Sequence, residues 1–326
     1  MSKLETKIIR WGILGLGHIA QKFAQDIASV HGAKLYSVAS RSPQKASSFA
    51  NQFHVPVSYG SYELLVKDPL VDAIYIATPH SFHKEHAILC LQHKKAVLCE
   101  KPFAMNLEEV EEMISVSERE NTLIMEALWT TFLPHYQYLI NFLKNKTFGK
   151  VLCLEADFGF KSTHGLDSRV LKKELGGGSL LDIGIYPVFL ALSTLGIPKS
   201  IEADATFFTN GADSSCEMIF NYDNSKAILK STFLKKTPTE AIFTCEHGVI
   251  KINTMFHQPT TITLLQNGIE EHVDFSAKTF GYNFEIEHFN QLLRDHKKES
   301  DLMSFSFSKD LIATLDLIRK KINLNY

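Results

Sequence analysis

The chain has 326 residues, of which 45% are hydrophobic and 21% charged, a composition typical of a globular protein long enough for two domains. Its 34 Lys and Arg residues nearly balance its 36 Asp and Glu residues, and the net charge of −2 argues against a nucleic-acid-binding or membrane-binding surface. The five cysteines contain no C-x-x-C pair, so we expect no metal site. An odd cysteine count and short apolar runs such as 73–77 predict a cytoplasmic protein without a membrane span.

The first part of the chain alternates short β-branched runs with amphipathic helical stretches. The predicted strands are 8–14, 34–39, 73–77, 96–99 and 123–126. The predicted helices are 20–30, 44–53, 83–94 and 107–120. Alternation of this kind is typical of a doubly wound parallel sheet, so the fold class is α/β in this part.

The second part is rich in strands that follow one another directly. The predicted strands are 151–160, 201–208, 216–222, 227–233, 241–244, 249–252, 260–265 and 271–275. The predicted helices are 134–144, 179–195, 284–297 and 308–322. This order predicts an α+β domain with a large, mostly antiparallel open sheet. One face of such a sheet lacks helices, which predicts a homodimer or a higher even homo-oligomer.

A glycine-rich turn follows the first predicted strand and opens the first helix. Gly15 permits a tight turn, Gly17 lets the backbone approach a pyrophosphate, and Ala20 allows close packing of helix on strand. His18 and Ile19 complete the first turn, whose N–H groups face the phosphates. The alternative is a glycine turn without a ligand. We expect residues 1–125 to be a dinucleotide-binding Rossmann domain and residues 126–326 a substrate-binding and dimerisation domain.

The end of the second predicted strand indicates which dinucleotide is bound. An Asp or Glu usually follows this strand and holds the 2′-hydroxyl of NAD. Here Ser40, Arg41 and Ser42 follow it instead. A guanidinium flanked by hydroxyl groups suits a 2′-phosphate, which favours NADP over NAD. The alternative is an arginine that is only solvated.

Two further strand ends carry polar residues. Thr78, Pro79 and His83 follow the strand at 73–77, and ligands of α/β sheets bind at such ends. His83 either lies near the cofactor or only opens the next helix. Glu100 and Lys101 end the following strand, where the ammonium could polarise a hydroxyl or a carbonyl beside the nicotinamide. A solvated lysine is the alternative.

Three glycines, Gly176-Gly177-Gly178, precede a helical run that contains Asp182 and Tyr186. The spacing of four predicts that both side chains share one helix face. A carboxylate and a phenol on one face can orient a substrate hydroxyl and exchange its proton. The alternative is an Asp that complements the helix dipole and a Tyr in the core.

These motifs together resemble the Gfo/Idh/MocA oxidoreductase family over nearly the whole chain. The motifs that carry the resemblance are Gly15-Leu-Gly17-His-Ile-Ala20, Glu100-Lys101-Pro102, the segment 176–186 and Gly281-Tyr-Asn-Phe-Glu285. Within the family the chain looks most like the branch of diol and NADP-dependent D-xylose dehydrogenases. The resemblance implies a Rossmann domain followed by a domain with a large open sheet.

The resemblance also implies the roles of individual residues. Lys101 and Tyr186 would be catalytic, and Asp182 would orient the substrate. His83 would lie near the coenzyme, and Arg41 would bind its 2′-phosphate. The predicted activity is NADP-dependent hydride transfer to or from a secondary alcohol or carbonyl of a sugar, cyclitol or cyclic diol.

Three questions stay open at this level. A non-catalytic dinucleotide-binding sensor on the same fold is an alternative, although a sensor has no need of Lys101, Asp182 and Tyr186. A glycosidase of the family that uses NAD transiently is another. The aromatic residues Trp129, Phe132, Phe158 and Phe160 could line the substrate pocket or belong to the core. They therefore do not identify the substrate.

Overall fold

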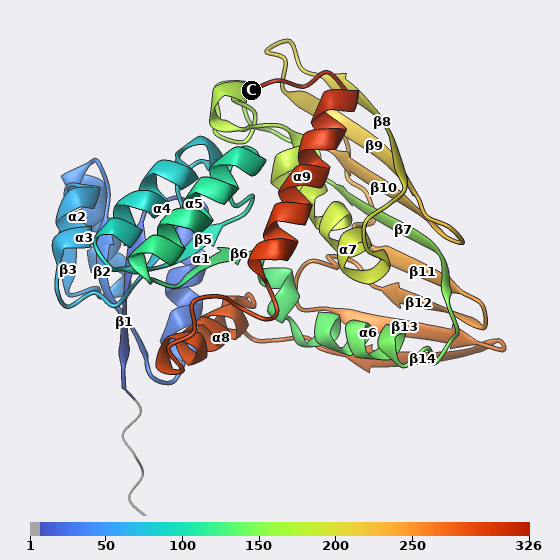
Figure 1. Cartoon of the computed structure of the whole chain (residues 1–326), viewed down its shortest axis with the longest axis horizontal. Helices are drawn as coiled ribbons and strands as arrows, with labels where there is room; N and C mark the ends of the chain where they lie inside the picture. Colours follow the sequence, from blue (N-terminus) through green and yellow to red (C-terminus); the bar gives the residue numbers. More distant parts are fainter. Residues whose placement is uncertain (1–6) are drawn as a thin grey trace, which may run out of the picture. The chain divides into compact units, whose positions relative to one another are not determined.

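The computed structural model describes residues 7–326 (Figure 1). Residues 1–6 lie outside the described residues. Contacts between backbone positions divide the chain into two compact units. The first unit consists of Met1–Phe132 and Thr279–Lys309, and the second of Leu133–Lys278 and Asp310–Tyr326.

The first unit contains a parallel sheet of six strands in the order β3-β2-β1-β4-β5-β6. The strands are β1 (Ile9–Leu14), β2 (Ala33–Ala39), β3 (Val57–Tyr59), β4 (Ala73–Ile76), β5 (Ala96–Glu100) and β6 (Ile124–Ala127). β4 and β5 are buried along their whole length, as expected for a sheet covered on both faces. The predicted doubly wound α/β fold is confirmed.

Six helices belong to the first unit. They are α1 (His18–Asp26), α2 (Pro43–Phe53), α3 (Tyr62–Lys67), α4 (His83–Gln92), α5 (Leu107–Glu120) and α8 (Tyr282–Arg294). The bounds predicted for α5 are confirmed, because Asn106 caps its first turn and Asn121 ends it in the left-handed conformation. The sequence analysis missed β3 and α3, which are too short to show a clear periodicity.

Asp26 fixes α8 within the first unit, although 256 residues separate it from Tyr282. The Asp26 carboxylate accepts hydrogen bonds from the backbone N–H groups of Phe280, Gly281 and Tyr282 at 3.1, 2.9 and 2.9 Å. A buried carboxylate thus satisfies donors at the start of a helix that have no partner within it. This contact explains why a late segment of the chain packs with the N-terminal sheet.

The second unit is built on one sheet in the order β14-β13-β12-β11-β7-β10-β9-β8. Its strands are β7 (Val151–Gly159), β8 (Ser200–Phe207), β9 (Asp213–Asn221), β10 (Lys226–Thr232), β11 (Ala241–Cys245), β12 (Gly248–Ile252), β13 (Thr261–Gln266) and β14 (Ile269–Asp274). Neighbouring strands are antiparallel except β7 and β10, which pair in parallel. The prediction of a large, mostly antiparallel sheet is confirmed.

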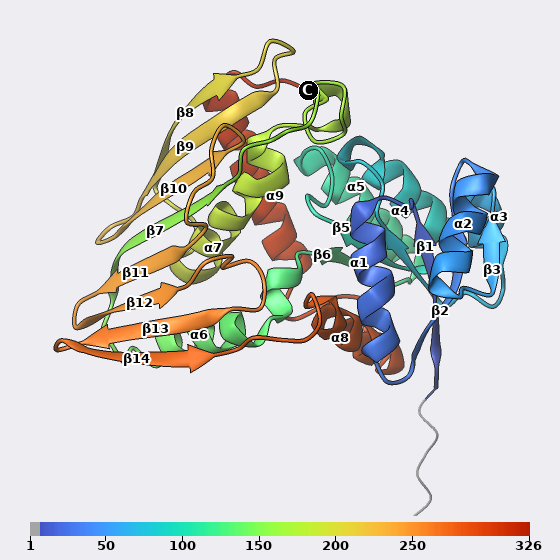
Figure 2. The ribbon, with the colours of Figure 1, turned by 180° about the vertical axis from the view of Figure 1, so that it is seen from behind.

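Helices cover one face of this sheet and leave the other bare (Figures 1 and 2). They are α6 (Pro134–Lys144), α7 (Ile185–Leu195) and the part of α9 (Phe305–Lys321) that follows Lys309. On the bare face Ile219 lies opposite Ile228 on the neighbouring strand, whereas Phe220 and Leu229 beside them are buried. Alternation of buried and outward residues therefore gives this sheet one core face.

The helical run predicted over 179–195 is confirmed, although its first part is not α-helical. Leu180–Gly184 forms a π-helical turn, and the α-helix begins only at Ile185. In the described part of the chain, the helical stretch Lys173–Leu195 has the length and apolar composition of a membrane span. However, 94% of its most apolar window is buried inside the fold, which is typical of a core helix.

Candidate active site

The glycine turn after β1 has the geometry that phosphate binding requires. Gly15 has a φ of +92°, and a Cβ there would lie 2.7 Å from Thr78 Cγ2, so only glycine fits. Gly17 is the N-cap of α1, and a Cβ there would contact only Ala77 O, at 4.0 Å. The open space beside Gly17 and the N–H groups of the first turn, which includes His18, Ile19 and Ala20, form a cradle for an anion.

A cavity of about 290 Å³ lies next to this turn in the first unit. Its lining residues come from the ends of β2 and β4 and from α3 and α4: Arg41, Gly60, Ser61, Tyr62, Glu63, Thr78, Pro79, Phe82, Glu85, His86 and Leu89. Arg41 is exposed, and its guanidinium lies 5.8 Å from the centre of the Phe82 ring. Ser40 accepts a hydrogen bond from the N–H of Ser42, and Ser42 in turn caps α2. The two serines therefore hold Arg41 at the mouth of the cavity.

His86 forms part of the wall of this cavity. Its Nδ1 lies 3.0 Å from Thr78 Oγ1, and its ring packs against Tyr62 and Phe82. Burial, and then the positive charge of Arg41, lowers the pKa of His86 to about 4. The imidazole is therefore neutral at physiological pH and leaves Arg41 as the cation of the cavity.

His83 is fully buried at the start of α4. Its Nδ1 lies 2.8 Å from Pro102 O, and its Nε2 lies 3.0 Å from Thr78 O. His83 thus ties the turn after β4 to the turn after β5. Of the two alternatives left open by the sequence, this geometry gives His83 a positioning role at the strand ends and places it on the first turn of the helix.

Two buried carboxyl groups hold the turn that contains Lys101. The Glu100 carboxylate accepts hydrogen bonds from the Tyr75 hydroxyl and from the N–H of Lys101. Glu126 accepts from Phe103 N at 3.0 Å and from Ser308 Oγ at 2.7 Å. Burial raises the pKa of Glu126 to about 7. Both carboxyl groups hold backbone, so Lys101 stands on a rigid turn whose Lys101-Pro102 peptide is cis.

In the second unit, Asp182 lies within the π-helical turn and Tyr186 lies in α7. The π turn continues directly into α7, so Asp182 and Tyr186 stay four residues apart on one helical segment, and their shared face remains a prediction. Asp182 forms an ion pair with Arg169, with Nη2 and Oδ1 3.2 Å apart. Asp213 holds the start of the turn by accepting from Ser179 Oγ and Leu180 N, each at 2.7 Å.

Packing explains two of the three glycines before this turn. A Cβ on Gly177 would lie 2.7 Å from the backbone of Lys172. Gly178 has a φ of +133°, and its Cβ would lie 2.1 Å from Asp213 Oδ1. These glycines therefore let the loop and Asp213 approach the turn that carries Asp182.

Tyr186 packs within an aromatic cluster in the second unit. Its ring centre lies 5.7 Å from that of Phe158 and 4.9 Å from that of His257. Phe160 packs on Phe233 at 5.0 Å and lies 6.4 Å from Phe158. The sequence analysis missed His257, since it lies in a loop without a motif and only its distance to Tyr186 draws attention to it.

Two other aromatic candidates belong to the packing of the first unit. Trp129 stacks on Tyr282 at 4.6 Å and 25°, and Phe132 packs against His288 at 5.0 Å. Both side chains are buried, at 5% and 6% exposed. Their contacts fix α8 against the segment that follows β6.

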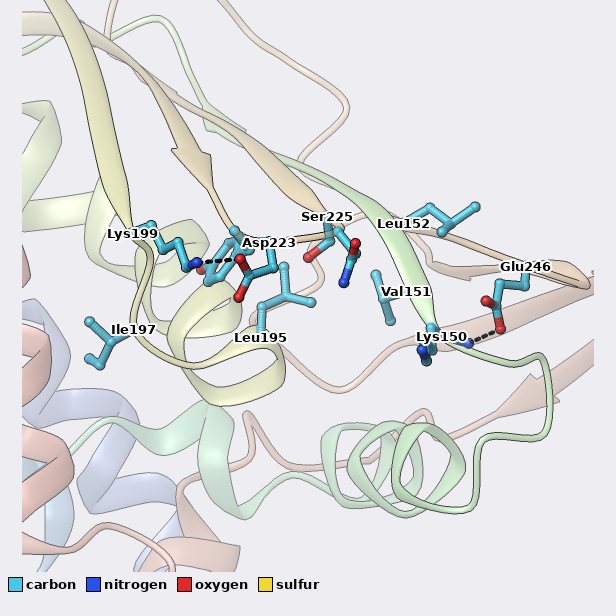
Figure 3. A pocket seen from close by; sticks show the side chains of 11 residues that line it. Lys150, Val151, Leu152, Leu195, Ile197, Lys199, Asp223, Ser225 and Glu246 are labelled. Carbon is cyan, nitrogen blue, oxygen red and sulfur yellow. Dashed lines mark hydrogen bonds and ion pairs between the residues drawn. The ribbon is translucent and has the colours of Figure 1, made fainter.

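A larger cavity, of about 550 Å³, lies in the second unit away from Tyr186 (Figure 3). Its wall includes Val151 at the start of β7 and Leu195 at the end of α7, whereas Phe158 and Tyr186 lie at the other ends of these elements. Figure 3 shows Lys199 paired with Asp223 at its rim. Within residues 7–326 no group of three or more His, Cys, Asp or Glu residues is arranged to hold a metal ion.

Residues 9–128 match the family described as "Oxidoreductase family, NAD-binding Rossmann fold", and residues 136–251 match the "GFO/IDH/MocA C-terminal domain". The chain belongs to the Gfo/Idh/MocA oxidoreductase family. Among its relatives, trans-1,2-dihydrobenzene-1,2-diol dehydrogenase of Xenopus tropicalis is 34% identical, over 97% of this chain and 99% of the relative. The scyllo-inositol 2-dehydrogenase (NADP(+)) of Bacillus subtilis is 31% identical over 98% of both chains.

Solved structures of other proteins share the fold. The aldose-aldose oxidoreductase from Caulobacter crescentus superposes with a TM-score of 0.89 at 20% identity, over 97% of this chain and 98% of the other. A 3-ketoreductase from Actinomadura kijaniata, solved with NADP and TDP-benzene, gives 0.86 at 22% identity over 96% and 98%. At these sequence identities the similarity shows a shared fold.

Proposed function

We propose that this protein is an NADP-dependent oxidoreductase that acts on a secondary alcohol or the corresponding carbonyl of a sugar, cyclitol or cyclic diol. Membership of the Gfo/Idh/MocA family supports hydride-transfer chemistry, and the full-length relatives act on diols and inositols by name. The observation that carries the proposal for this chain is the cradle at Gly17 together with the adjoining cavity that contains Arg41.

The residues of the first unit fit a phosphorylated dinucleotide. The open space at Gly17 and the first turn of α1 suit a pyrophosphate, since a helix N-terminus attracts anions. Arg41 suits a 2′-phosphate because no carboxylate follows β2 to hold a 2′-hydroxyl. Thr78 and Pro79 line the cavity between these two positions. Bound NADP would supply the hydride acceptor or donor.

The proposed roles of the chemical residues follow from what each group can do. Tyr186 takes the proton of the reacting hydroxyl in oxidation and returns it in reduction. A phenol has an ordinary pKa of about 10, so it needs a positive charge to act as a base near neutral pH. Lys101 supplies that charge and polarises the reacting oxygen. Asp182, with its partner Arg169, orients a further substrate hydroxyl.

We propose further that the protein is a cytoplasmic homodimer. The bare sheet face of the second unit exposes the apolar side chains of Ile219 (38%) and Leu265 (40%), as a face that pairs with a second copy would. Two-fold pairing is the commonest way to cover such a face. The five free cysteines suit a reducing compartment.

The test is a substrate panel followed by NADPH absorbance. Purified protein is mixed with NADP and, in turn, with aldoses, inositols and cyclic trans-diols, and with the matching ketones and NADPH. Turnover of at least one cyclic polyol that is lost in the Tyr186→Phe variant supports the proposal. NADP binding without turnover across the panel would instead favour a sensor.

A further inference from the structure

The cavity beside β2 and β4 contains a contact that the proposed function leaves unexplained, between the Tyr62 hydroxyl and the Arg41 guanidinium. Tyr62 begins α3, and both residues line the cavity. α3 packs against β2 and α4, which brings its first turn to the cavity wall. There the guanidinium donates a hydrogen bond to the Tyr62 hydroxyl. This contact joins two segments that no spacing in the sequence relates.

Packing between aromatic rings fixes the position of Tyr62. Its ring meets His86 edge-on, with centres 4.8 Å apart and planes inclined by 76°. His86 in turn stacks with Phe82 at 5.8 Å and 25°. The Arg41 guanidinium lies over the Phe82 ring, 5.8 Å from its centre. Arg41 therefore has two uncharged neighbours on the cavity wall before a ligand arrives.

The phenol of Tyr62 stays neutral beside this cation. Burial raises its pKa, and the charge and hydrogen bond of Arg41 oppose that rise without reversing it. A neutral hydroxyl accepts a hydrogen bond and leaves the guanidinium charge uncompensated, whereas a carboxylate in the same place would cancel it. Tyr62 therefore fixes the direction of the guanidinium while Arg41 keeps its charge for an anion.

Two carboxylates in the same wall can compete for Arg41. Glu63 and Glu85 are exposed and line the cavity. Hydrogen bonds from the backbone N–H of Glu63 and then from the Ser61 hydroxyl lower the pKa of Glu63, so it is charged at physiological pH. Without the Tyr62 hydroxyl, the long Arg41 side chain is free to turn toward either carboxylate, which would weaken its attraction for an anion in the cavity.

We propose that Tyr62 is a positioning residue that sets the preference for NADP over NAD, by holding the Arg41 guanidinium toward the 2′-phosphate and away from the neighbouring carboxylates. This rests on the proposed function, in which Arg41 binds that phosphate. The hydroxyl acts only through Arg41, so it contributes to the affinity for a ligand that carries the phosphate and not to the affinity for one that lacks it. An arginine already held in place also loses less side-chain freedom on binding, which favours the phosphorylated cofactor further.

The test measures equilibrium binding by titration calorimetry, so it does not depend on turnover. Tyr62→Phe keeps the ring against His86 and removes only the hydroxyl. We expect the Kd of NADP to rise roughly five- to tenfold, the contribution of about one hydrogen bond, with the Kd of NAD within about twofold. Adenosine 2′,5′-diphosphate, which has the phosphate but no nicotinamide, should lose the same factor. Equal changes for NADP and NAD, or no change for either, overturn the inference.

A double-mutant cycle separates a direct role of Tyr62 from an action through Arg41. In the Arg41→Ala background, Tyr62→Phe should change the Kd of NADP less than about twofold, because the residue through which it acts is gone. A loss as large as in the wild-type background overturns the inference. Tyr36→Phe is the matched control and should alter neither Kd, since Tyr36 is a half-buried tyrosine on β2 that does not line the cavity.

Failure of the proposed function gives a different result. A wild type without preference for NADP, or an Arg41→Ala variant that weakens binding of both cofactors equally, contradicts the cofactor assignment. A preference that Arg41→Ala abolishes and Tyr62→Phe leaves intact contradicts this inference alone.

Discussion

Arg41 is the residue that we propose to bind the 2′-phosphate of NADP, since it lies exposed in the wall of the cavity while His86 in the same wall stays neutral. Arg41→Ala should weaken NADP binding by roughly ten- to a hundredfold, the worth of about 1.5–3 kcal/mol for a charge-assisted hydrogen bond, and leave NAD binding nearly unchanged. Titration of both cofactors by fluorescence checks this. The control is Lys45→Ala, which removes a neighbouring exposed charge in α2. Equal losses for NADP and NAD would defeat the assignment.

Tyr186 is 6% exposed and packs against Phe158 and His257, and removal of its hydroxyl should leave this ring packing intact. Tyr186→Phe should lower kcat by about 10²–10⁴, the usual contribution of general acid–base catalysis, with little change in NADP affinity. Lys101→Met should lower kcat by a similar factor. The double variant should lose little more than either single one, because residues that act as a unit are not additive.

These effects are measured by single-turnover kinetics, in which the chemical step limits the rate. A Tyr186→Phe variant that keeps more than about a third of the wild-type rate would remove Tyr186 from the acid–base role. The matched control is Tyr138→Phe, since Tyr138 lies in α6 and packs on Phe142 and Phe275 rather than on Tyr186.

At the level of elements, Glu126 on β6 joins the turn after β5 to Ser308 in the first turn of α9. Its pKa of about 7, against an ordinary 4.5, means that the folded chain holds a proton which the unfolded chain releases. The stabilisation from this proton is complete below pH 4.5 and is lost as the pH rises through 7. The loss amounts to roughly 3 kcal/mol at 1.36 kcal/mol per pKa unit.

Glu126→Gln should remove this dependence. The amide is always neutral, its oxygen can accept from Phe103 N, and its NH₂ group can donate to Ser308 Oγ. Urea unfolding between pH 4.5 and 8 should show a flatter stability curve for the variant, with its advantage growing toward pH 8. Glu111→Gln, on the exposed face of α5, is the control. Parallel curves for wild type and Glu126→Gln would show that Glu126 ionises freely in the fold.

At the level of the whole molecule, the proposed homodimer depends on the sheet face that no helix covers. Ile219 and Ile228 lie opposite each other on β9 and β10 and point away from the core. In a two-fold interface each would meet the same patch of a second copy, so a charge there would face its own counterpart. Light scattering should give the wild type twice the chain mass of 36.8 kDa at micromolar concentration.

The double variant Ile219→Lys, Ile228→Lys should run as a monomer with unchanged circular dichroism. Ile197→Lys, which alters an exposed isoleucine in the loop between α7 and β8, is the control and should remain dimeric. A monomer mass for the wild type in light scattering would contradict the proposed homodimer.

Much of this molecule was determined by local sequence alone. The bounds of α5 follow from its caps Asn106 and Asn121, and the start of α6 follows from Pro134 in its first turn; the predicted bounds of both helices agree with the structure. The Gly15 turn was predictable because a positive φ and a close approach leave no choice but glycine. Such features depend on neighbours within one turn of the chain, which a sequence displays directly.

Other features were decided only by contacts between distant segments. The π turn at Leu180–Gly184 arises where Asp213, on another strand, holds Ser179 and Leu180. The return of α8 to the first unit depends on Asp26. His257 reaches Tyr186 because His135 holds its loop, and no spacing in the chain reveals this. Periodicity in the sequence shows which face of a helix or strand is buried. It does not show which other segment covers that face, because that depends on hydrogen bonds and side-chain volumes that must match between segments far apart in the chain.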